Sequence, residues 1–208
     1  MKYPVQLREA RKGIKIYVPE LELVKPTYEQ LIIEDATTPF PFWAKIWASS
    51  IAICDFLIEN PQWVQGKTVL ELGAGMGLPS FSMAKYATRI LISDHAADAV
   101  ELLHKNINHL QLTNTSATCI DWNKIPNHIN ADIILLSDVN YAPNEFESLM
   151  KILNGFLKKG STLIIATPQR MMGIPFIESL QPYIKESITK SIFEEETEVF
   201  ISIYILYK

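Results

Sequence analysis

The sequence predicts an α/β protein with a doubly wound sheet that is mostly parallel and ends in an antiparallel hairpin. From Lys67 onward, short apolar runs typical of strands alternate with amphipathic segments typical of helices. The run at residues 133–136, Ile-Ile-Leu-Leu, has the continuous apolar character of a strand buried on both faces. Two further strand-like runs end the chain and are close enough in sequence to pair with each other.

The region before Lys67 predicts one strand and one helix. Residues 12–18 alternate in polarity and predict a short strand. A loop-rich connection is then expected, because four prolines follow: Pro19, Pro26, Pro39 and Pro41. A helix is expected over residues 44–59, ended by Pro61. Its apolar face is expected to consist of Trp47, Ile51, Cys54 and Ile58.

The alternating part predicts seven strands with helices between them. The strands are expected at residues 68–72, 89–94, 116–121, 132–137, 161–166, 187–193 and 199–206. The helices are expected at residues 79–86, around 100–110, from 143 to the Lys158-Lys159-Gly160 stop, and at 174–183. An acidic turn at residues 194–196 is expected to join the last two strands.

Composition narrows the class of protein. The net charge is −4 at pH 7, and no Lys/Arg run reaches five residues, which disfavours a nucleic-acid partner. No apolar run has the length of a membrane span and the first residues do not resemble a signal peptide, so we expect a cytoplasmic protein without a membrane partner. Cys54 and Cys119 lie in apolar segments and are expected to be buried free thiols. No metal-ligand spacing is present, and a monomer is the favoured oligomeric state.

The most informative feature is a turn with glycine at every second position, Glu71-Leu72-Gly73-Ala74-Gly75-Met76-Gly77. A side chain at any of the three glycines would fill space where a ligand must touch backbone. The turn leads into a helix N-terminus, whose free N–H groups suit a polar ligand. It therefore indicates binding of a nucleoside-like cofactor.

Two cofactors compete for this turn. The dinucleotide pattern G-x-G-x-x-G would place its third glycine at Leu78, but glycine stands one position earlier, at Gly77. A carboxylate at Glu71 suits the cation-rich S-adenosylmethionine (SAM) better than a pyrophosphate. The pattern resembles motif I of class I SAM-dependent methyltransferases, whose Rossmann-like seven-stranded fold also ends in an antiparallel hairpin. SAM is the favoured cofactor, with S-adenosylhomocysteine as its product after methyl transfer. NAD and a purely structural turn are the alternatives. Gly73, Ala74, Gly75 and Gly77 are expected to bind the cofactor.

Acids at two further strand ends complete the predicted cofactor site. Asp94 can accept both ribose hydroxyls, a role that serves NAD and SAM alike, and His95 can flank the nucleoside. In class I methyltransferases an acid at the place of Asp121 often accepts from the adenine amino group, and Trp122 could cover the ring. The alternatives are a helix N-cap for Asp94, solvent exposure for His95 and packing at the domain edge for Trp122.

The most apolar strand is followed by Ser137-Asp138-Val139-Asn140-Tyr141. In the class I fold this strand end lies beside the methyl group to be transferred. Ser137 is therefore assigned to the cofactor, and Asp138 and Tyr141 are assigned to the acceptor as catalytic residues. An unpaired buried carboxylate is costly, which argues against a core role for Asp138. The alternative is that Asp138 caps the turn before the helix that begins at Pro143.

Three segments together carry a narrower resemblance: Pro41-Phe42-Trp43-Ala44-Lys45-Ile46-Trp47, the run Gly66–Pro79, and Asp138-x-x-Tyr141. They resemble the family 16 methyltransferases, which include protein-lysine methyltransferases and nicotinamide N-methyltransferase-like relatives. The resemblance covers roughly residues 39–166. It implies that Trp47 lies near bound SAM and that the Asp-x-x-Tyr pair lies near the acceptor nitrogen.

The resemblance implies SN2 transfer of a methyl group to a nitrogen. The favoured acceptor is the side chain of a protein lysine. A protein methyltransferase should have an open acidic cleft, and the acidity of the chain favours a basic acceptor. A small-molecule N-methyltransferase should have a closed pocket built by the N-terminal segment and residues 168–173. A SAM-binding protein without catalysis and a NAD oxidoreductase are the remaining alternatives. We expect a single domain, 1–208, with 1–38 as an N-terminal extension and 39–208 as the cofactor-binding and catalytic core.

Overall fold

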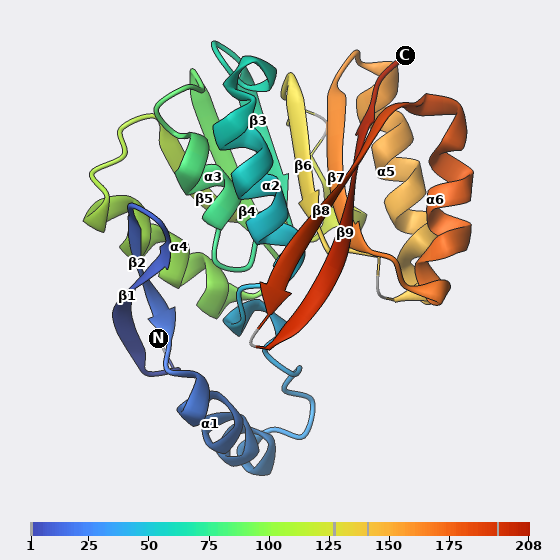
Figure 1. The fold of residues 1–208 in the computed structure, drawn as a ribbon. Helices are drawn as coiled ribbons and strands as arrows, with labels where there is room; N and C mark the ends of the chain where they lie inside the picture. The colour runs from blue at the N-terminus through green and yellow to red at the C-terminus, as the bar shows by residue number, and fades with distance from the viewer. Residues whose placement is uncertain (1, 127, 141, 195) are drawn as a thin grey trace.

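The protein is described here by a computed structural model covering residues 2–126, 128–140, 142–194 and 196–208. Its centre is a seven-stranded sheet in the order β5-β4-β3-β6-β7-β9-β8 (Figure 1). The parallel strands are β3 (Thr68–Leu72), β4 (Arg89–Asp94), β5 (Thr115–Cys119), β6 (Ile133–Ser137) and β7 (Thr162–Pro168). The last two strands, β8 (Ile184–Glu194) and β9 (Thr197–Leu206), form an antiparallel hairpin, in which β9 also pairs antiparallel with β7. The predicted mostly parallel sheet with a terminal hairpin is confirmed.

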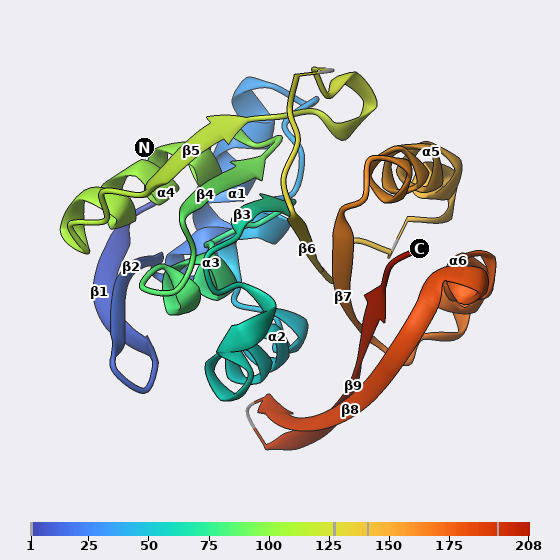
Figure 2. The same cartoon turned by 90° about the horizontal axis from the view of Figure 1, so that it is seen from above.

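Helices cover both faces of this sheet (Figure 2). One face carries α2 (Ala48–Glu59), α3 (Leu78–Met83) and α4 (Ala97–His109), and the other carries α5 (Phe146–Lys158) and α6 (Ile174–Leu180). Short 3₁₀ turns join the elements: η1 (Phe42–Ala44), η2 (Pro61–Trp63), η3 (Trp122–Lys124), η4 (Pro143–Glu145), η5 (Met171–Gly173) and η6 (Gln181–Tyr183). None of the described helices combines the length and apolarity that a membrane span requires.

The position of β6 between two helical layers explains why its sequence is apolar throughout. Successive side chains of a strand point to opposite faces. Ile133 and Leu135 therefore pack into the core beneath α2, α3 and α4, whereas Ile134 and Leu136 pack into the core beneath α5 and α6. Because all four residues are at most 3% exposed, a polar residue would have no solvated face to occupy.

An antiparallel hairpin of β1 (Val5–Arg11) and β2 (Ile14–Pro19) packs outside the main sheet, against α4. The strand predicted at residues 12–18 corresponds to β2, but β1 was not predicted. Ile16 and Val18 enter the core with at most 2% exposure. The buried Asn106 of α4 fixes the hairpin: its Oδ1 accepts from the Tyr17 N–H at 2.7 Å, and its Nδ2 donates to the Tyr17 carbonyl at 2.9 Å.

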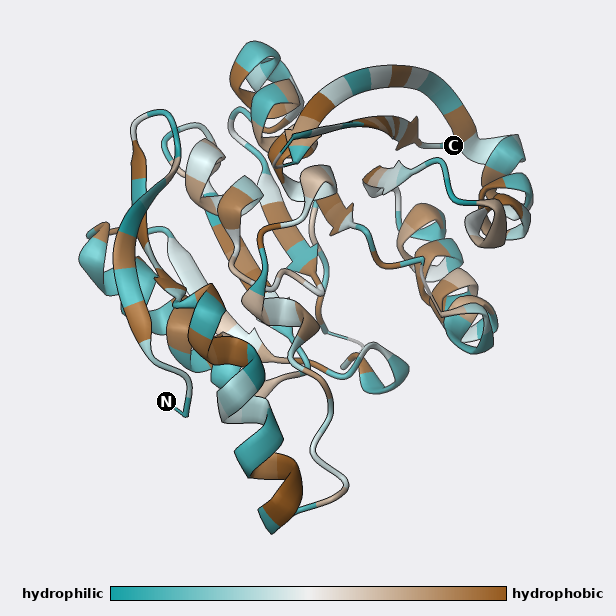
Figure 3. Ribbon diagram, turned by 60° about the horizontal axis from the view of Figure 1, so that its bottom comes forward, coloured by the Kyte–Doolittle hydropathy of each residue, from teal (hydrophilic) through white to brown (hydrophobic). Residues whose placement is uncertain are grey.

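Helix α1 (Leu21–Glu34) contradicts the prediction of a loop-rich connection. Pro26 lies inside the helix and removes one backbone hydrogen bond without ending it. Val24 is the buried residue among the fourteen of α1, and apolar segments of the helix remain on its outer surface (Figure 3). The prolines in this region were therefore misleading as a signal for a loop.

The helix predicted at 44–59 is confirmed, but its start and part of its predicted apolar face are wrong. Helix α2 begins at Ala48, because η1 and an extended link precede it and Trp47 is its N-cap residue. Its buried side includes Ile53, Phe56 and Leu57, whereas Ile58 is 42% exposed. The expectation that Ile58 belongs to the apolar face is therefore wrong.

The two cysteines differ in environment. Cys54 is buried in α2, as predicted, and burial raises the pKa of its thiol to about 11. Cys119 is exposed, so the expectation of a second buried thiol is wrong. The reason is its place at the last position of β5, an edge strand of the sheet. The strand also stops there, so that Asp121 lies two residues beyond its end.

Candidate cofactor and acceptor site

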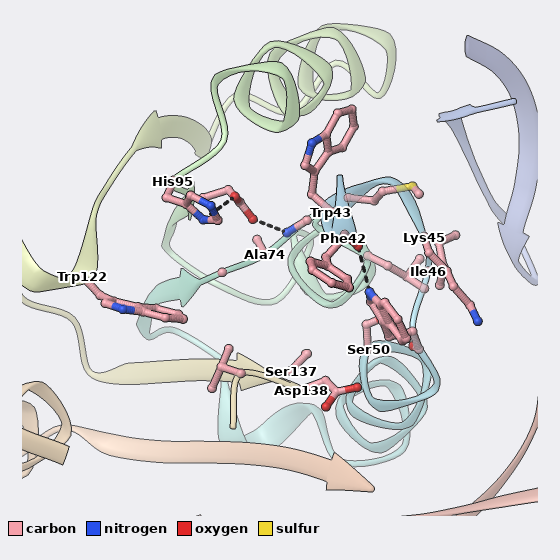
Figure 4. A pocket seen from close by; sticks show the side chains of 17 residues that line it. Phe42, Trp43, Lys45, Ile46, Ser50, Ala74, His95, Trp122, Ser137 and Asp138 are labelled. Carbon is pink, nitrogen blue, oxygen red and sulfur yellow. Dashed lines mark hydrogen bonds and ion pairs between the residues drawn. The ribbon is translucent and has the colours of Figure 1, made fainter. Parts of the chain in front are cut away.

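A pocket lies where β3, β4 and β6 end, and the segment around η1 covers it (Figure 4). Its empty space is about 680 Å³, including the open mouth. The predicted site residues that line it are Trp47, Gly73, Ala74, Gly75, Asp94, His95, Trp122, Ser137 and Asp138. Three separate strand ends thus converge on one cavity, as the parallel sheet requires.

Three predicted residues have other positions, and a fourth cannot be placed. Glu71 and Gly77 are not among the lining residues of this pocket. Asp121 lines an adjoining cavity that shares Gly73, His95 and Trp122 with the pocket, so that a groove continues past the tryptophan. Tyr141 lies outside the described residues.

The backbone conformation of the turn and the protein atoms around it favour glycine at three positions. Its three glycines have φ angles of 62°, 53° and 69°, a left-handed backbone that disfavours other residues. A Cβ added at Gly75 would lie 3.3 Å from the Trp43 carbonyl oxygen, and one at Gly77 would lie 2.6 Å from Leu103 Cδ2. At Gly77, which does not line the pocket, the Leu103 side chain occupies the space that was expected to belong to a ligand. Gly73 and Gly75 line the pocket, and their contact with a ligand stays a prediction.

Asp94 ties the end of β4 to this turn. The residue is 4% exposed; its Oδ2 accepts from the Gly75 N–H at 2.9 Å, and its Oδ1 accepts from the Ala96 N–H at 2.9 Å. The exposed His95 places its Nδ1 3.4 Å from Oδ1 (Figure 4). Ala96 is the N-cap residue of α4, so Asp94 is not the helix cap. The carboxylate is fixed at the pocket wall with lone pairs left for ligand hydroxyls.

Glu71 lies beneath the turn rather than in the pocket. It is fully buried, and its Oε2 accepts from both the N–H and the hydroxyl of Ser80 in α3. Its Oε1 has no hydrogen-bond partner among the described residues. Burial raises the pKa of Glu71 to about 7, while the Ser80 hydrogen bonds oppose the rise. In this position the side chain supports the start of α3, below the glycines.

Two tryptophans supply aromatic surface to the pocket. The Trp47 Nε1 donates to the Phe42 carbonyl at 3.0 Å, and the Lys45 Nζ lies 4.9 Å from the Trp47 ring centre. The half-buried Trp122 donates from Nε1 to Glu145 Oε2 at 3.4 Å. Lys45 and Trp122 lie at opposite ends of the pocket (Figure 4). Such an arrangement suits a ligand with a flat ring at the Trp122 end.

Asp138 has an ionic partner that was not predicted. The Arg170 Nη1 lies 2.6 Å from Oδ1 and Nη2 lies 3.0 Å from Oδ2, a bidentate pair. Asp138 is 8% exposed and has a φ of 56°. Burial raises the pKa of its carboxyl, and Arg170 opposes that rise. The alternative of a helix cap is wrong, because Ala142 is the N-cap residue of η4.

Ser137 provides a test of cofactor fit. Its hydroxyl is buried, has no hydrogen-bond partner among the described residues and belongs to a residue that lines the pocket. Buried polar groups are normally paired, so a ligand with a polar group here would complete the site. Together with the acid Asp94 and the Trp122 ring, this fits a nucleoside that carries a polar amino-acid end. SAM has that composition.

A family described as lysine methyltransferase has a sequence model that matches residues 26–185. The chain belongs to this family. Its members are SAM-dependent methyltransferases, and SAM is accordingly the cofactor of this protein.

Two named protein methyltransferases are similar to part of the chain. The histone-arginine methyltransferase METTL23 of Homo sapiens is 28% identical over 125 residues, which are 55% of this chain and 63% of METTL23. The protein N-terminal and lysine N-methyltransferase EFM7 of Debaryomyces hansenii is 28% identical over 150 residues, which are 62% of this chain and 59% of EFM7. The chain thus spans less than two thirds of the length of these relatives.

Solved structures confirm the fold of this lysine methyltransferase family member. The N-methyltransferase NodS from Bradyrhizobium japonicum, in complex with S-adenosyl-L-homocysteine, superimposes with a TM-score of 0.62. The match covers 86% of this chain and 98% of NodS. Because the sequence identity is only 11%, this likeness shows the fold alone.

Sequence reasoning missed several residues of the pocket. They are Phe42, Trp43, Lys45, Ile46, Ser50, Met76, Leu78 and Val139. The signal for the first four was present in the aromatic segment that carried the family resemblance, although only Trp47 received a role there. Arg170 had no such signal, because a buried acid requires a cation without indicating which one.

Proposed function

We propose that the protein is a SAM-dependent methyltransferase whose acceptor is a lysine side chain of a protein. The observation that carries this proposal is the set of residues that line the pocket. No described residue of segments 2–38 and 168–173 lines it. A small-molecule enzyme was expected to close its pocket with those two segments. A pocket that these segments do not line favours an acceptor that enters on a side chain and leaves most of its molecule outside.

The relatives support a nitrogen acceptor in a protein. METTL23 is named for histone arginine, and EFM7 is named for protein N-termini and lysine. A histidine protein methyltransferase 1 homologue from Dictyostelium discoideum is 26% identical over 155 residues. All three names denote nitrogen acceptors within proteins. Lysine is preferred here because the family matched over residues 26–185 is described by it.

The geometry of the pocket and of the adjoining cavity supports the proposed cofactor roles. SAM supplies a methyl group on a sulfonium, which is already a good leaving group. Asp94 would accept the ribose hydroxyls, and His95 would flank the nucleoside. Asp121 would meet the adenine amino group while the Trp122 ring covers the base. Backbone at Gly73, Ala74 and Gly75, with the Ser137 hydroxyl, would hold the amino-acid end, and Trp47 would close the remaining side. Glu71 and Gly77 would act from beneath, by fixing the turn and α3.

The acceptor roles fall to the segment that follows β6. A lysine with a reference pKa near 10.4 must lose a proton before it attacks, which costs about 4.6 kcal/mol at pH 7. Asp138 would hold the incoming ammonium and align the nitrogen lone pair. Tyr141 would present a ring face and a hydroxyl to the nitrogen, as the family resemblance implies. Water can carry the released proton away, so that neither residue needs to be a strong base.

Two substitutions separate the cofactor role from the acceptor role. Asp138→Asn keeps the size of the side chain and tolerates the left-handed backbone. It is expected to lower kcat about 100-fold through loss of acceptor alignment, while the Kd for SAM changes less than about twofold. Asp94→Asn is expected to raise the Kd for SAM about tenfold or more, because one carboxylate oxygen becomes a donor facing a backbone N–H.

Calorimetric titration of SAM and transfer of labelled methyl groups measure the two effects. Asp98→Asn is the matched control, because Asp98 accepts from the Lys2 backbone N–H and does not line the pocket. It should change neither quantity. An equal loss of SAM affinity in the Asp138 variant would contradict this division of roles.

A further inference from the structure

The acceptor carboxylate does not stand alone in the structure. Both oxygens of Asp138 face the Arg170 guanidinium, at 2.6 Å and 3.0 Å. The carboxylate is withdrawn from solvent, since the Asp138 side chain is 7% exposed, whereas the Arg170 side chain is 35% exposed. A fork of two parallel hydrogen bonds fixes both the orientation and the charge of a carboxylate.

Backbone hydrogen bonds in the connection from β7 to α6 hold Arg170 in this position. The Arg170 N–H donates to the Pro168 carbonyl at 2.7 Å, and the Gly173 N–H donates to the Arg170 carbonyl at 3.0 Å. A second tie lies beside the ion pair, where the Thr167 hydroxyl donates to Asn140 Oδ1 at 2.7 Å. The end of β7, through Thr167, and the connection, through Arg170, therefore hold the Asp138–Asn140 segment at two points.

The other charged groups near Asp138 cannot take the place of Arg170. Glu194 of β8 raises the pKa of the Asp138 carboxyl, as burial does. The nearby cation Lys45 forms an ion pair with Glu194. Asp94 and His95 line the same pocket and contact each other. Among the described residues, Arg170 is the cation in contact with Asp138.

We propose that Arg170 is a positioning residue of the acceptor site, which holds Asp138 as an ionised carboxylate in one orientation while the acceptor nitrogen enters. The part that concerns the acceptor rests on the proposed function. The part that concerns the state of Asp138 does not. Arg170 is assigned no contact with the acceptor or with SAM; its effect passes through Asp138.

The consequence for pH has a definite sign. Burial raises the pKa of Asp138 and Arg170 lowers it, so removal of the arginine raises it further. At mildly acidic pH a larger fraction of Asp138 would then be protonated, and a protonated carboxyl would no longer hold an ammonium group. The acid limb of the pH profile of kcat/KM should therefore move to higher pH.

The first test measures Asp138 directly and needs no activity. Protein labelled with ¹³C at the aspartate carboxyl is titrated by NMR without SAM, and Asp138→Asn identifies the resonance. Arg170→Gln is expected to raise the titration midpoint of Asp138 by about one pH unit or more. Arg170→Lys keeps a charge without the fork and is expected to raise it by about half a unit. Arg11→Gln, which breaks a second bidentate pair with Asp55 outside the pocket, should leave the midpoint unchanged.

The second test measures methyl transfer and SAM binding in the same variants. Arg170→Gln should shift the acid limb of kcat/KM in parallel with the NMR midpoint, with the Kd for SAM within about twofold of the native value. A uniform loss of activity without a shift would mean that Arg170 is only structural and would overturn the proposal. An unchanged or lowered midpoint in Arg170→Gln would also overturn it. Should that variant fail to fold, a midpoint in Arg170→Lys at or below the native one would overturn it.

The two proposals can fail separately. A native protein that transfers no methyl group would refute the proposed function, while the NMR titration would still decide the role of Arg170 toward Asp138. A native protein that transfers methyl groups, with no midpoint shift in the variants, would refute only the inference about Arg170.

Discussion

Glu71 is a fully buried acid whose ionisation opposes folding. Its pKa of about 7 in the folded state lies above the reference value of 4.5, so the folded state binds the proton more tightly. The free energy of unfolding therefore falls as pH rises from 4.5 to about 7. Glu71→Gln removes this dependence and should gain about 2 kcal/mol relative to the native protein between pH 5 and pH 8.

Denaturant unfolding at several pH values measures the Glu71 effect. Glu147→Gln, at an exposed position of α5, is the matched control and should follow the native pH dependence. Parallel stability profiles for the native protein and Glu71→Gln would show that burial of this carboxyl does not carry the effect.

Residues of the site could be predicted from the sequence where they stand at the ends of strands. Asp94 and Ser137 stand directly at the ends of β4 and β6, so recognising the strands places them beside the glycine turn. Arg170 was not predictable, because its partner lies 32 residues away and the pairing depends on the course of the β7–α6 connection. The burial of Glu71 beneath the turn was equally hidden, because its neighbour Ser80 comes from α3.

The glycine turn and α3 form an element whose geometry can be tested by one added methyl group. Gly77 precedes α3 with a φ of 69°, and its Cβ would lie 2.6 Å from the end of the Leu103 side chain. Gly77→Ala should lower the free energy of unfolding by about 1–3 kcal/mol, from backbone strain and crowding.

Gly155 provides the matched comparison for Gly77. It lies inside α5 with no neighbouring atom within 4 Å of an added Cβ. Gly155→Ala should raise the free energy of unfolding by about 0.5–1 kcal/mol, because alanine favours the helix. Thermal or denaturant unfolding measures both variants. Effects of the same sign would contradict the packing argument.

Elements were predictable where hydrophobic periodicity was strong. The strands of the parallel sheet and helices α4 and α5 show their apolar pattern in the sequence, because both sides of the sheet are covered. Helix α1 lacks such a pattern, since Val24 is its buried residue, and Pro26 suggested a loop. Strand β1 was missed for a related reason: most of its side chains are exposed, so it shows little apolar alternation.

At the scale of the whole molecule, we propose that residues 1–208 form one domain in which the N-terminal hairpin is part of the core. Ile16 is fully buried against the core that α4 covers, whereas Ile33 at the end of α1 is 85% exposed. Ile16→Ala should lower the free energy of unfolding by about 2–4 kcal/mol. Ile33→Ala should change it by less than about 0.5 kcal/mol.

Denaturant unfolding tests this domain proposal. A single transition that shifts with Ile16→Ala fits one cooperative unit. An N-terminal transition separate from the main one would contradict it. The sequence predicted the overall architecture because the strand–helix alternation and the terminal hairpin together suit one sheet order. It could not predict that residues 5–19 pack on α4, since contacts between distant segments such as Tyr17 and Asn106 leave no local pattern.

Transfer of tritiated methyl groups from SAM tests the central claim most directly. The purified protein is added to a desalted lysate of the source organism, supplemented with nicotinamide and related amines, and the products are divided into macromolecular and small-molecule fractions. We predict label in a discrete protein band, located on lysine after digestion and lost with Asp138→Asn. Label confined to small molecules would contradict a protein acceptor, and absence of label from both fractions would contradict methyl transfer itself.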